Sequence, residues 1–198
     1  MFVTFEGLDG SGKSTQADLL RRRLEAEGRE VVATREPGGT PLGEHVRELL
    51  LRGDAMTPWS EAALFTAARA QLVEDVIRPA IDRGADVICD RYLDSSLAYQ
   101  GLARGLGIER VLQLNLEATG GLLPDVTFLL LVDPEDSHAR LGEERDRIER
   151  EDDDFRARVD AAYRQLAELF PRRVVALDGS RTPDEIAQEI DGRLRALA

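Results

Sequence analysis

The 198-residue sequence lacks the residues that several classes of protein require. Its single cysteine, Cys89, excludes an intramolecular disulfide, and its two histidines, His45 and His138, do not have the spacing of a zinc site. No stretch approaches the roughly 20 apolar residues that cross a bilayer. The formal charge of -12 argues against binding to nucleic acid or to an anionic membrane, because both depend on a basic face.

The remaining composition is typical of a globular protein. Hydrophobic residues make up 42% of the chain and charged residues 32%, which is enough to bury a sizeable core. Because we find no repeat, low-complexity tract or linker, we expect one domain spanning residues 1–198. The opening MFVTFEG predicts a strand and not a signal peptide, so we expect a cytoplasmic protein.

Short apolar runs alternate with longer stretches of helical spacing. This alternation predicts an α/β fold in which a parallel sheet is covered by helices on both faces. The predicted strands are residues 2–6, 31–35, 86–90, 126–133 and 173–178. The predicted helices are residues 13–27, 42–51, 59–83, 93–118 with a break at 105–107, 155–170 and 183–197.

The stretch FEGLDGSGKST, residues 5–15, matches the phosphate-loop pattern G-x-x-x-x-G-K-[ST], with a predicted strand before it and a helix after it. In such a loop, backbone N–H groups surround the phosphates, the lysine reaches the β and γ oxygens, and the hydroxyl binds magnesium. The lysine of this loop is the only one among 26 basic residues. A glycine-rich turn without a ligand is the alternative. The predicted ATP-binding residues are Gly7, Leu8, Asp9, Gly10, Ser11, Gly12, Lys13, Ser14 and Thr15, with Ser14 as a metal ligand.

A phosphate loop predicts a nucleoside triphosphate as ligand but leaves the reaction open. A GTPase needs an Asn-Lys-x-Asp element for guanine, and the only asparagine, Asn115, is followed by Leu-Glu. The sequence also shows no feature of a mechanical or signalling ATPase. The class that remains is a small kinase, in which a lid closes over donor and acceptor to exclude water.

Two candidate acceptor segments follow predicted strands. TREPGGT, residues 34–40, should bring Arg35 to the carboxyl edge of the sheet, where open α/β sheets bind ligands. DRY, residues 90–92, ends the next strand in the same way. Asp90 could hold magnesium through water, and Arg91 could clamp a phosphate. A plain surface turn and a strand-end ion pair are the respective alternatives.

Phe65 and Arg69 lie four residues apart in a predicted helix and therefore share one face. A ring that stacks on a base and a guanidinium that donates to a keto oxygen would form a base pocket. Spacing alone favours the simpler interpretation, in which the pair lies at the edge of the core and on the surface.

Five segments, taken in order, carry a resemblance to a known family: FEGLDGSGKST, TREPGGT, LFTAARAQL (64–72), DRY with SSLAYQG (95–101), and DRIE (146–149). They cover essentially the whole chain, and their combination is specific where each later motif alone would be weak. Together they resemble thymidylate kinase, a phosphotransferase that converts dTMP to dTDP with ATP. The resemblance implies the P-loop nucleoside monophosphate kinase fold, with a five-stranded parallel sheet flanked by helices and a lid at about residues 140–153.

The resemblance also assigns roles at the acceptor site. Phe65 is expected to stack on thymine and Arg69 to donate to its O4, a contact that the amino group of cytosine could not accept. Tyr99 is expected to pack under the sugar, and Asp9 to accept a hydrogen bond from the 3′-hydroxyl. The expected substrate-binding residues are Asp9, Arg35, Pro37, Phe65, Arg69, Arg91, Ser96, Tyr99 and Gln100, with Arg35 and Arg91 on the dTMP phosphate.

The segment RLGEERDRIEREDDDFRAR, residues 140–158, is almost entirely charged, so we expect no core residue in it. For residues 150–158 we predict a solvated helix face. The resemblance implies that arginines of the lid reach the transferring phosphoryl group, because Gly10 stands where other members of the family carry a basic residue. The arginine within DRIE is the strongest candidate. The expected catalytic residues are Lys13, Arg91, Arg140, Arg145 and Arg147.

We therefore predict a magnesium-dependent dTMP kinase without a covalent enzyme intermediate. Its expected partners are ATP and dTMP, without nucleic acid or membrane, and the resemblance implies a homodimer. A kinase for another nucleotide or for a nucleoside is one alternative, and a non-catalytic nucleotide-binding module is another. Arg35 and Arg91 favour an acceptor that already carries a phosphate.

Overall fold

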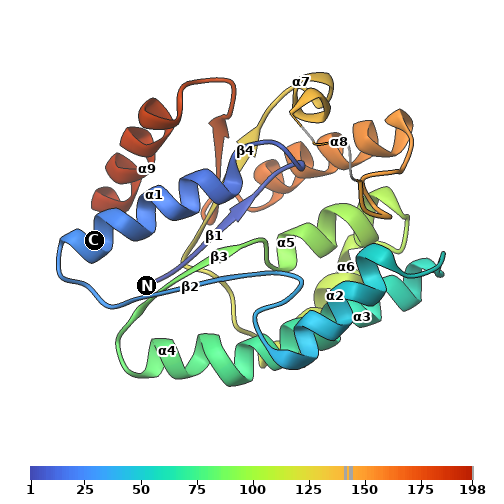
Figure 1. Ribbon diagram of the computed structural model, residues 1–198, viewed down its shortest axis with the longest axis horizontal. Coiled ribbons are helices and arrows are strands. Elements are labelled where there is room, and N and C mark those ends of the chain that lie inside the picture. Colours follow the sequence, from blue (N-terminus) through green and yellow to red (C-terminus); the bar gives the residue numbers. More distant parts are fainter. Residues whose placement is uncertain (141, 143–144, 198) are drawn as a thin grey trace.

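A computed structural model describes residues 1–140, 142 and 145–197 of the chain. Its five strands form one parallel sheet in the order β2-β3-β1-β4-β5 (Figure 1). The prediction of a five-stranded parallel sheet is therefore confirmed. The strands are β1 (Phe2–Glu6), β2 (Val31–Arg35), β3 (Asp86–Asp90), β4 (Val126–Leu131) and β5 (Val174–Asp178).

Helices connect the strands and cover both faces of the sheet. The α-helices are α1 (Lys13–Ala26), α2 (Pro41–Arg52), α3 (Pro58–Leu72), α4 (Arg78–Asp82), α5 (Leu93–Ser96), α6 (Ile108–Thr119), α7 (Pro134–Ala139), α8 (Asp153–Leu169) and α9 (Pro183–Leu197). Two π-helical segments, η1 (Val73–Ile77) and η2 (Leu97–Ala103), continue α3 and α5. None of the described helices is long and apolar enough to cross a membrane.

Successive side chains of a strand point to opposite faces of the sheet, and this divides the core in two. On one face, Val3 and Phe5 of β1 pack with residues of α1 and α9. On the other, Phe2 belongs to a larger cluster with α3, α6 and α8. Figure 1 shows α1 and α9 together on one side of the sheet and α4 on the other. Strands β1 and β3 are neighbours at the point where the strand order reverses direction along the sheet. Parallel α/β sheets bind ligands beyond the carboxyl ends of the strands at such a point.

Two expectations about helices were wrong. Helix α7 was missed, because six residues are too few for a helical period, although Asp133 caps it by accepting from the backbone N–H of Glu135 at 2.9 Å. The charged segment also contributes to the core, since Phe155 is buried and its ring centroid lies 6.2 Å from that of Tyr99. Asp152 caps α8 and so directs the first turn of that helix inward at Phe155. Three residues of the segment, 141, 143 and 144, lie outside the described residues.

Candidate active site

The phosphate loop connects β1 to α1 through glycines whose backbone no other residue adopts easily. Gly7, Gly10 and Gly12 have φ angles of 137°, 83° and 96°. A Cβ on Gly7 would lie 2.4 Å from the carbonyl oxygen of Leu130 in β4. The loop therefore needs glycine at these positions to turn back tightly against the sheet. Lys13 begins α1, and its Nζ donates to the carbonyl oxygen of Leu8 at 2.7 Å.

The two charged side chains of the loop have shifted pKa values. Burial lowers the pKa of Lys13 to about 8, and the positive charge of Arg91 acts in the same direction, against the attraction of Asp9. Burial alone would raise the pKa of Asp9, but Arg91 and Lys13 outweigh it and hold that pKa at about 2. At neutral pH, Asp9 is ionised and Lys13 is mostly protonated.

Arg91 links the phosphate loop to two helices. Its φ of 70° is the only positive value of a non-glycine residue in the described chain, and such outliers occur at functional sites. Its Nη2 donates to Asp9 Oδ1 at 2.6 Å. Its Nη1 donates to Ser95 Oγ and to Tyr163 Oη, each at 3.0 Å. The side chain is thus fixed by β1–α1, α5 and α8 together.

Glu6, the last residue of β1, is a buried carboxylate behind Arg91. It accepts hydrogen bonds from the backbone N–H of Tyr92 at 2.8 Å, from Ser95 Oγ at 2.6 Å and from Tyr163 Oη at 3.0 Å. Burial and the nearby Asp94 raise the pKa of Glu6, while Arg91 opposes them. Glu6 therefore holds Ser95 and Tyr163, the two groups that orient Arg91.

A cleft of about 490 Å³ is lined by Arg91 and Ser95 together with residues of the phosphate loop. Among the described residues, five cationic side chains line it together with five carboxylates: Lys13, Arg35, Arg47, Arg91 and Arg140, and Asp9, Glu36, Asp90, Asp146 and Glu149. Arg35 emerges from β2 and donates to Glu44 at 3.1 Å, and Arg47 donates to the carbonyl oxygen of Pro37 at 2.9 Å. The sequence-predicted residues that line the cleft are Asp9, Gly10, Gly12, Lys13, Ser14, Thr15, Arg35, Pro37, Phe65, Asp90, Arg91, Ser96, Tyr99, Gln100 and Arg140. Gly7, Leu8 and Ser11 lie in the same loop outside its lining.

Ser14 and Asp90 place two oxygen ligands side by side at the cleft. The hydroxyl of Ser14 donates to Asp90 Oδ2 at 2.5 Å. Magnesium prefers such hard oxygen donors and commonly uses one or two protein ligands together with phosphate oxygens and water. No cluster of three or more His, Cys, Asp or Glu side chains suited to a metal occurs in the part of the chain that the structure describes. The pair fits a magnesium ion that arrives with a nucleotide.

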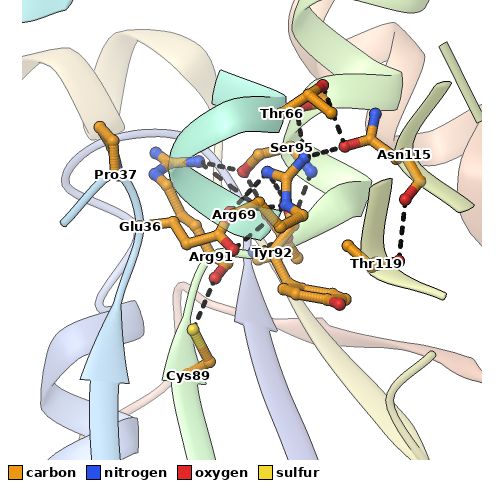
Figure 2. A network of polar contacts seen from close by, with 12 residues as sticks. Glu36, Pro37, Thr66, Arg69, Cys89, Arg91, Tyr92, Ser95, Asn115 and Thr119 are labelled. Atoms are coloured by element: carbon orange, nitrogen blue, oxygen red, sulfur yellow. Dashed lines mark hydrogen bonds and ion pairs between the residues drawn. The ribbon is translucent and has the colours of Figure 1, made fainter. Parts of the chain in front are cut away.

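Arg69 is placed differently from the expected base contact. It is 1% exposed and, among the described residues, it does not belong to the cleft lining. Its five N–H donors have protein acceptors: Nε and Nη2 donate to Glu36, Nη2 also to the carbonyl oxygen of Tyr92, and Nη1 to Ser96 and Asn115. Figure 2 shows the guanidinium between Glu36 and Asn115. Burial raises the pKa of Glu36 to about 7, although Arg69 opposes the shift.

The three lid arginines occupy different places. Arg140 lines the cleft, and its Nη1 lies 3.4 Å from the carbonyl oxygen of Gly10. Arg147 lies away from that lining and binds the carbonyl oxygen of Leu50 through Nε at 2.8 Å and Glu61 through Nη2 at 2.7 Å. Arg145 is likewise outside the lining in the described structure. Of the three, Arg140 is the one that both lines the cleft and contacts the phosphate loop in the described structure.

Several residues of the site were not predicted. Glu36 and Ser95 lie inside the motifs TREPGGT and SSLAYQG, next to residues that were predicted. Glu6 carried a signal of its own, because a carboxylate ends an otherwise largely apolar strand. No signal in the sequence marked Arg47, Glu61 or Tyr163, whose partners lie on other elements of the fold.

Comparisons with known proteins agree with this architecture. A family model described as thymidylate kinase matches residues 5–190. The chain is 53% identical over 199 residues to a thymidylate kinase of Leifsonia xyli, covering 98% of this chain and 94% of that protein. It is 49% identical over 203 residues to one from Bifidobacterium longum, covering 100% and 98%. A crystal structure of thymidylate kinase from Ehrlichia chaffeensis matches with a TM-score of 0.80 and 35% identity over 98% of both chains.

Proposed function

The chain belongs to the thymidylate kinase family, which phosphorylates dTMP to dTDP with ATP, and we propose that the cleft above the phosphate loop is where this transfer occurs. The expected phosphotransferase activity is confirmed by this membership, and the two alternatives are not favoured. The observation that carries the assignment to the cleft is that the phosphate loop forms part of its lining and that Lys13, Arg35 and Arg91 line the same space. Two phosphorylated substrates bring negative charge to that position.

On the donor side, we assign ATP to the phosphate loop and the start of α1. The backbone N–H groups of residues 7–15 and the helix N-terminus would bind the phosphates, and Lys13 would leave the carbonyl oxygen of Leu8 to bind the β and γ oxygens. Ser14 and Asp90 would hold magnesium, Asp90 directly or through water. Bound magnesium would neutralise charge that develops on the phosphate oxygens.

On the acceptor side, we assign dTMP to the part of the cleft lined by Phe65 and Tyr99. Arg35 and Arg91 would grip its phosphate from two directions, which fixes the attacking oxygen in line with the γ-phosphorus. Asp9 would accept a hydrogen bond from the 3′-hydroxyl.

The base is assigned to Phe65 together with Pro37, Ser96 and Gln100, which also line the cleft. Arg69 can donate to thymine O4 only if Nη1 exchanges Ser96 or Asn115 for the base. We propose that this exchange of hydrogen-bond partners occurs when dTMP binds.

For the lid, we propose that residues 140–153 close over the phosphates. Arg140 is the first candidate to reach the transferring group, because it already lies beside Gly10. Arg147 would first have to leave Glu61 and the carbonyl oxygen of Leu50. Arg145 remains the weakest candidate.

The whole chain would act as one kinase domain and pair as a homodimer. Leu42 and Leu49 lie seven residues apart on one face of α2 and are 45% and 54% exposed, and Trp59 at the start of α3 is 39% exposed. Helices α2 and α3 contact each other, so these side chains would supply apolar surface to the proposed interface. Sedimentation velocity measures the association state directly.

A panel of acceptors tests the proposal. With ATP and magnesium, dTMP should give ADP and dTDP, whereas thymidine should not, because Arg35 and Arg91 would have no phosphate to bind. Arg35→Met should raise KM for dTMP roughly tenfold or more and leave KM for ATP unchanged. Arg22→Met, an exposed arginine on α1 outside the cleft lining, is the matched control. Thymidine turnover equal to that of dTMP would contradict the phosphate grip, and ATP binding without any ADP formation would contradict catalysis.

A further inference from the structure

Glu61 is a buried carboxylate to which none of the roles above has been assigned. It lies in the first turn of α3 and is 2% exposed. Its Oε1 accepts from Gln100 Nε2 at 2.8 Å and from Arg104 Nε at 3.3 Å. Its Oε2 accepts from Arg147 Nη2 at 2.7 Å and from Arg104 Nη2 at 3.2 Å. Three side chains from η2, the loop after it and the lid segment therefore converge on one carboxylate.

Glu61 is ionised at neutral pH. Burial alone would raise its pKa, but the hydrogen bond from Gln100 and those from Arg147 and Arg104 outweigh burial and lower it. An ionised carboxylate can only accept hydrogen bonds. The group of Gln100 that faces Glu61 must therefore be its NH₂, and the orientation of this amide is fixed by chemistry.

The carbonyl oxygen of Gln100 consequently lies on the other arm of the amide. Gln100 is 1% exposed and lines the cleft next to Tyr99. Among the side-chain hydrogen bonds of residues 1–140, 142 and 145–197, the only one that involves the amide of Gln100 is the one to Glu61. The carbonyl oxygen of the Gln100 side chain is thus available to accept a hydrogen bond from a ligand in the cleft.

We propose that Glu61 is a positioning residue for base recognition: it holds the amide of Gln100 with its carbonyl oxygen toward the cleft, so that the site selects a pyrimidine with a hydrogen-bond donor at N3. This inference rests on the proposed function, in which the cleft binds dTMP. Thymine carries an N–H at N3. Cytosine carries a lone pair there, which would face the lone pairs of the Gln100 carbonyl oxygen.

The two arginines make this arrangement stable. A buried carboxylate without cations would become protonated and could then donate to Gln100 as well as accept from it. Arg104 and Arg147 keep Glu61 charged, and Arg104 is itself held by Glu151 at 2.6 Å and by the ring of Phe155, whose centroid lies 4.3 Å from its guanidinium carbon.

Glu61→Gln tests the proposal through specificity. Because Arg147 and Arg104 point at the Oε2 position, the amide oxygen of the variant should take that place and its NH₂ should face Gln100. Gln100 must then rotate and present its own NH₂ to the cleft. We expect the ratio of kcat/KM for dTMP to that for dCMP to fall about 100-fold or more, with dCMP turnover rising in absolute terms.

Two further variants separate positioning from structural support. Arg104→Met removes one cation from Glu61 but leaves Arg147, which still keeps the carboxylate charged, and the bond to Gln100. The ratio of kcat/KM for dTMP to that for dCMP should therefore stay within about threefold of the wild type. The double variant Glu61→Gln, Gln100→Glu restores an acceptor on the cleft side and should recover the preference for dTMP. If Glu61→Gln lowers kcat/KM for both nucleotides by the same factor, the positioning role is refuted.

A second measurement keeps the proposal testable if Glu61→Gln does not fold, as judged by circular dichroism and thermal unfolding. The wild-type protein is assayed with a dTMP analogue in which C–H replaces N3–H. Its kcat/KM should be at least tenfold lower than that of dTMP, and an equal value would refute the proposal. Failure of the proposed function looks different, because the wild-type protein would then form no dTDP from dTMP.

Discussion

ATP binding should take up a proton at Lys13. The pKa of this lysine is about 8 in the structure, because burial and the charge of Arg91 disfavour its charged form. Phosphate oxygens around Nζ would favour the charged form and raise the pKa toward or above its usual 10.5. The nucleotide therefore binds best to the protonated lysine.

The size of the effect follows from the free-state pKa. With a pKa of about 8, the neutral fraction of Lys13 is about 0.1 at pH 7, about 0.5 at pH 8 and about 0.9 at pH 9. The uptake on binding should have these values while the bound lysine stays protonated. Since the protonated form is lost as pH rises through 8, the Kd for ATP should increase by up to about tenfold per pH unit above that point.

Isothermal titration calorimetry in two buffers of different ionisation enthalpy measures the uptake. A non-hydrolysable ATP analogue prevents turnover, and the phosphate group, with a pKa near 6, contributes little at pH 8 to 9. Lys13→Arg is the matched control, because arginine stays charged and should give no uptake wherever it binds. The absence of uptake by the wild-type protein at both pH 8 and pH 9 would refute the assigned contact between Lys13 and the phosphates.

Two other predictions concern stability. Gly10→Ala would place a Cβ 2.4 Å from the carbonyl oxygen of Ser137 at a φ of 83°, so it should cost about 1–2 kcal/mol or more in urea unfolding and weaken ATP binding; unchanged values of both would contradict the tight packing. Arg173→Ala would leave Asp94, 2% exposed and bound at 2.5 and 2.7 Å, without its cation. It should cost about 3–5 kcal/mol in urea unfolding with kcat unchanged, and a loss below about 1 kcal/mol would contradict this.

The sheet and the phosphate loop could be predicted because their signals are local. The inner strands β1, β3 and β4 are buried almost throughout, and all five strands appear as short, largely apolar runs. The predicted runs match β1 to β5 within two residues at each end. The phosphate loop needs glycine wherever φ is positive, which fixes its pattern in the sequence. The helix break at residues 105–107 also follows from glycine, since both of its glycines have positive φ.

The partners of buried charges could not be predicted, because they come together only through the fold. Glu61 meets Arg147 across 86 residues, and Glu6 meets Tyr163 across 157. The family resemblance, and not its spacing on the helix, led us to expect Arg69 at the base. Arg69 does lie near the site, but its N–H groups donate to an acceptor just after β2 and to another on α6. Neither acceptor has a fixed spacing in the sequence from residue 69.

The cations of the cleft are held by acceptors that phosphate groups can replace. Lys13 and Arg140 lie against carbonyl oxygens of the loop, and Arg35 binds Glu44, which is itself exposed. An exposed ion pair contributes only about 0–1 kcal/mol, so exchanging it for a doubly charged phosphate costs little. The buried contacts differ, because Glu6 and Tyr163 fix Arg91 from behind. The site therefore combines cations that can change partners with one partly buried arginine whose position is set before substrate arrives. Such preorganisation is the main contribution a protein can make to phosphoryl transfer.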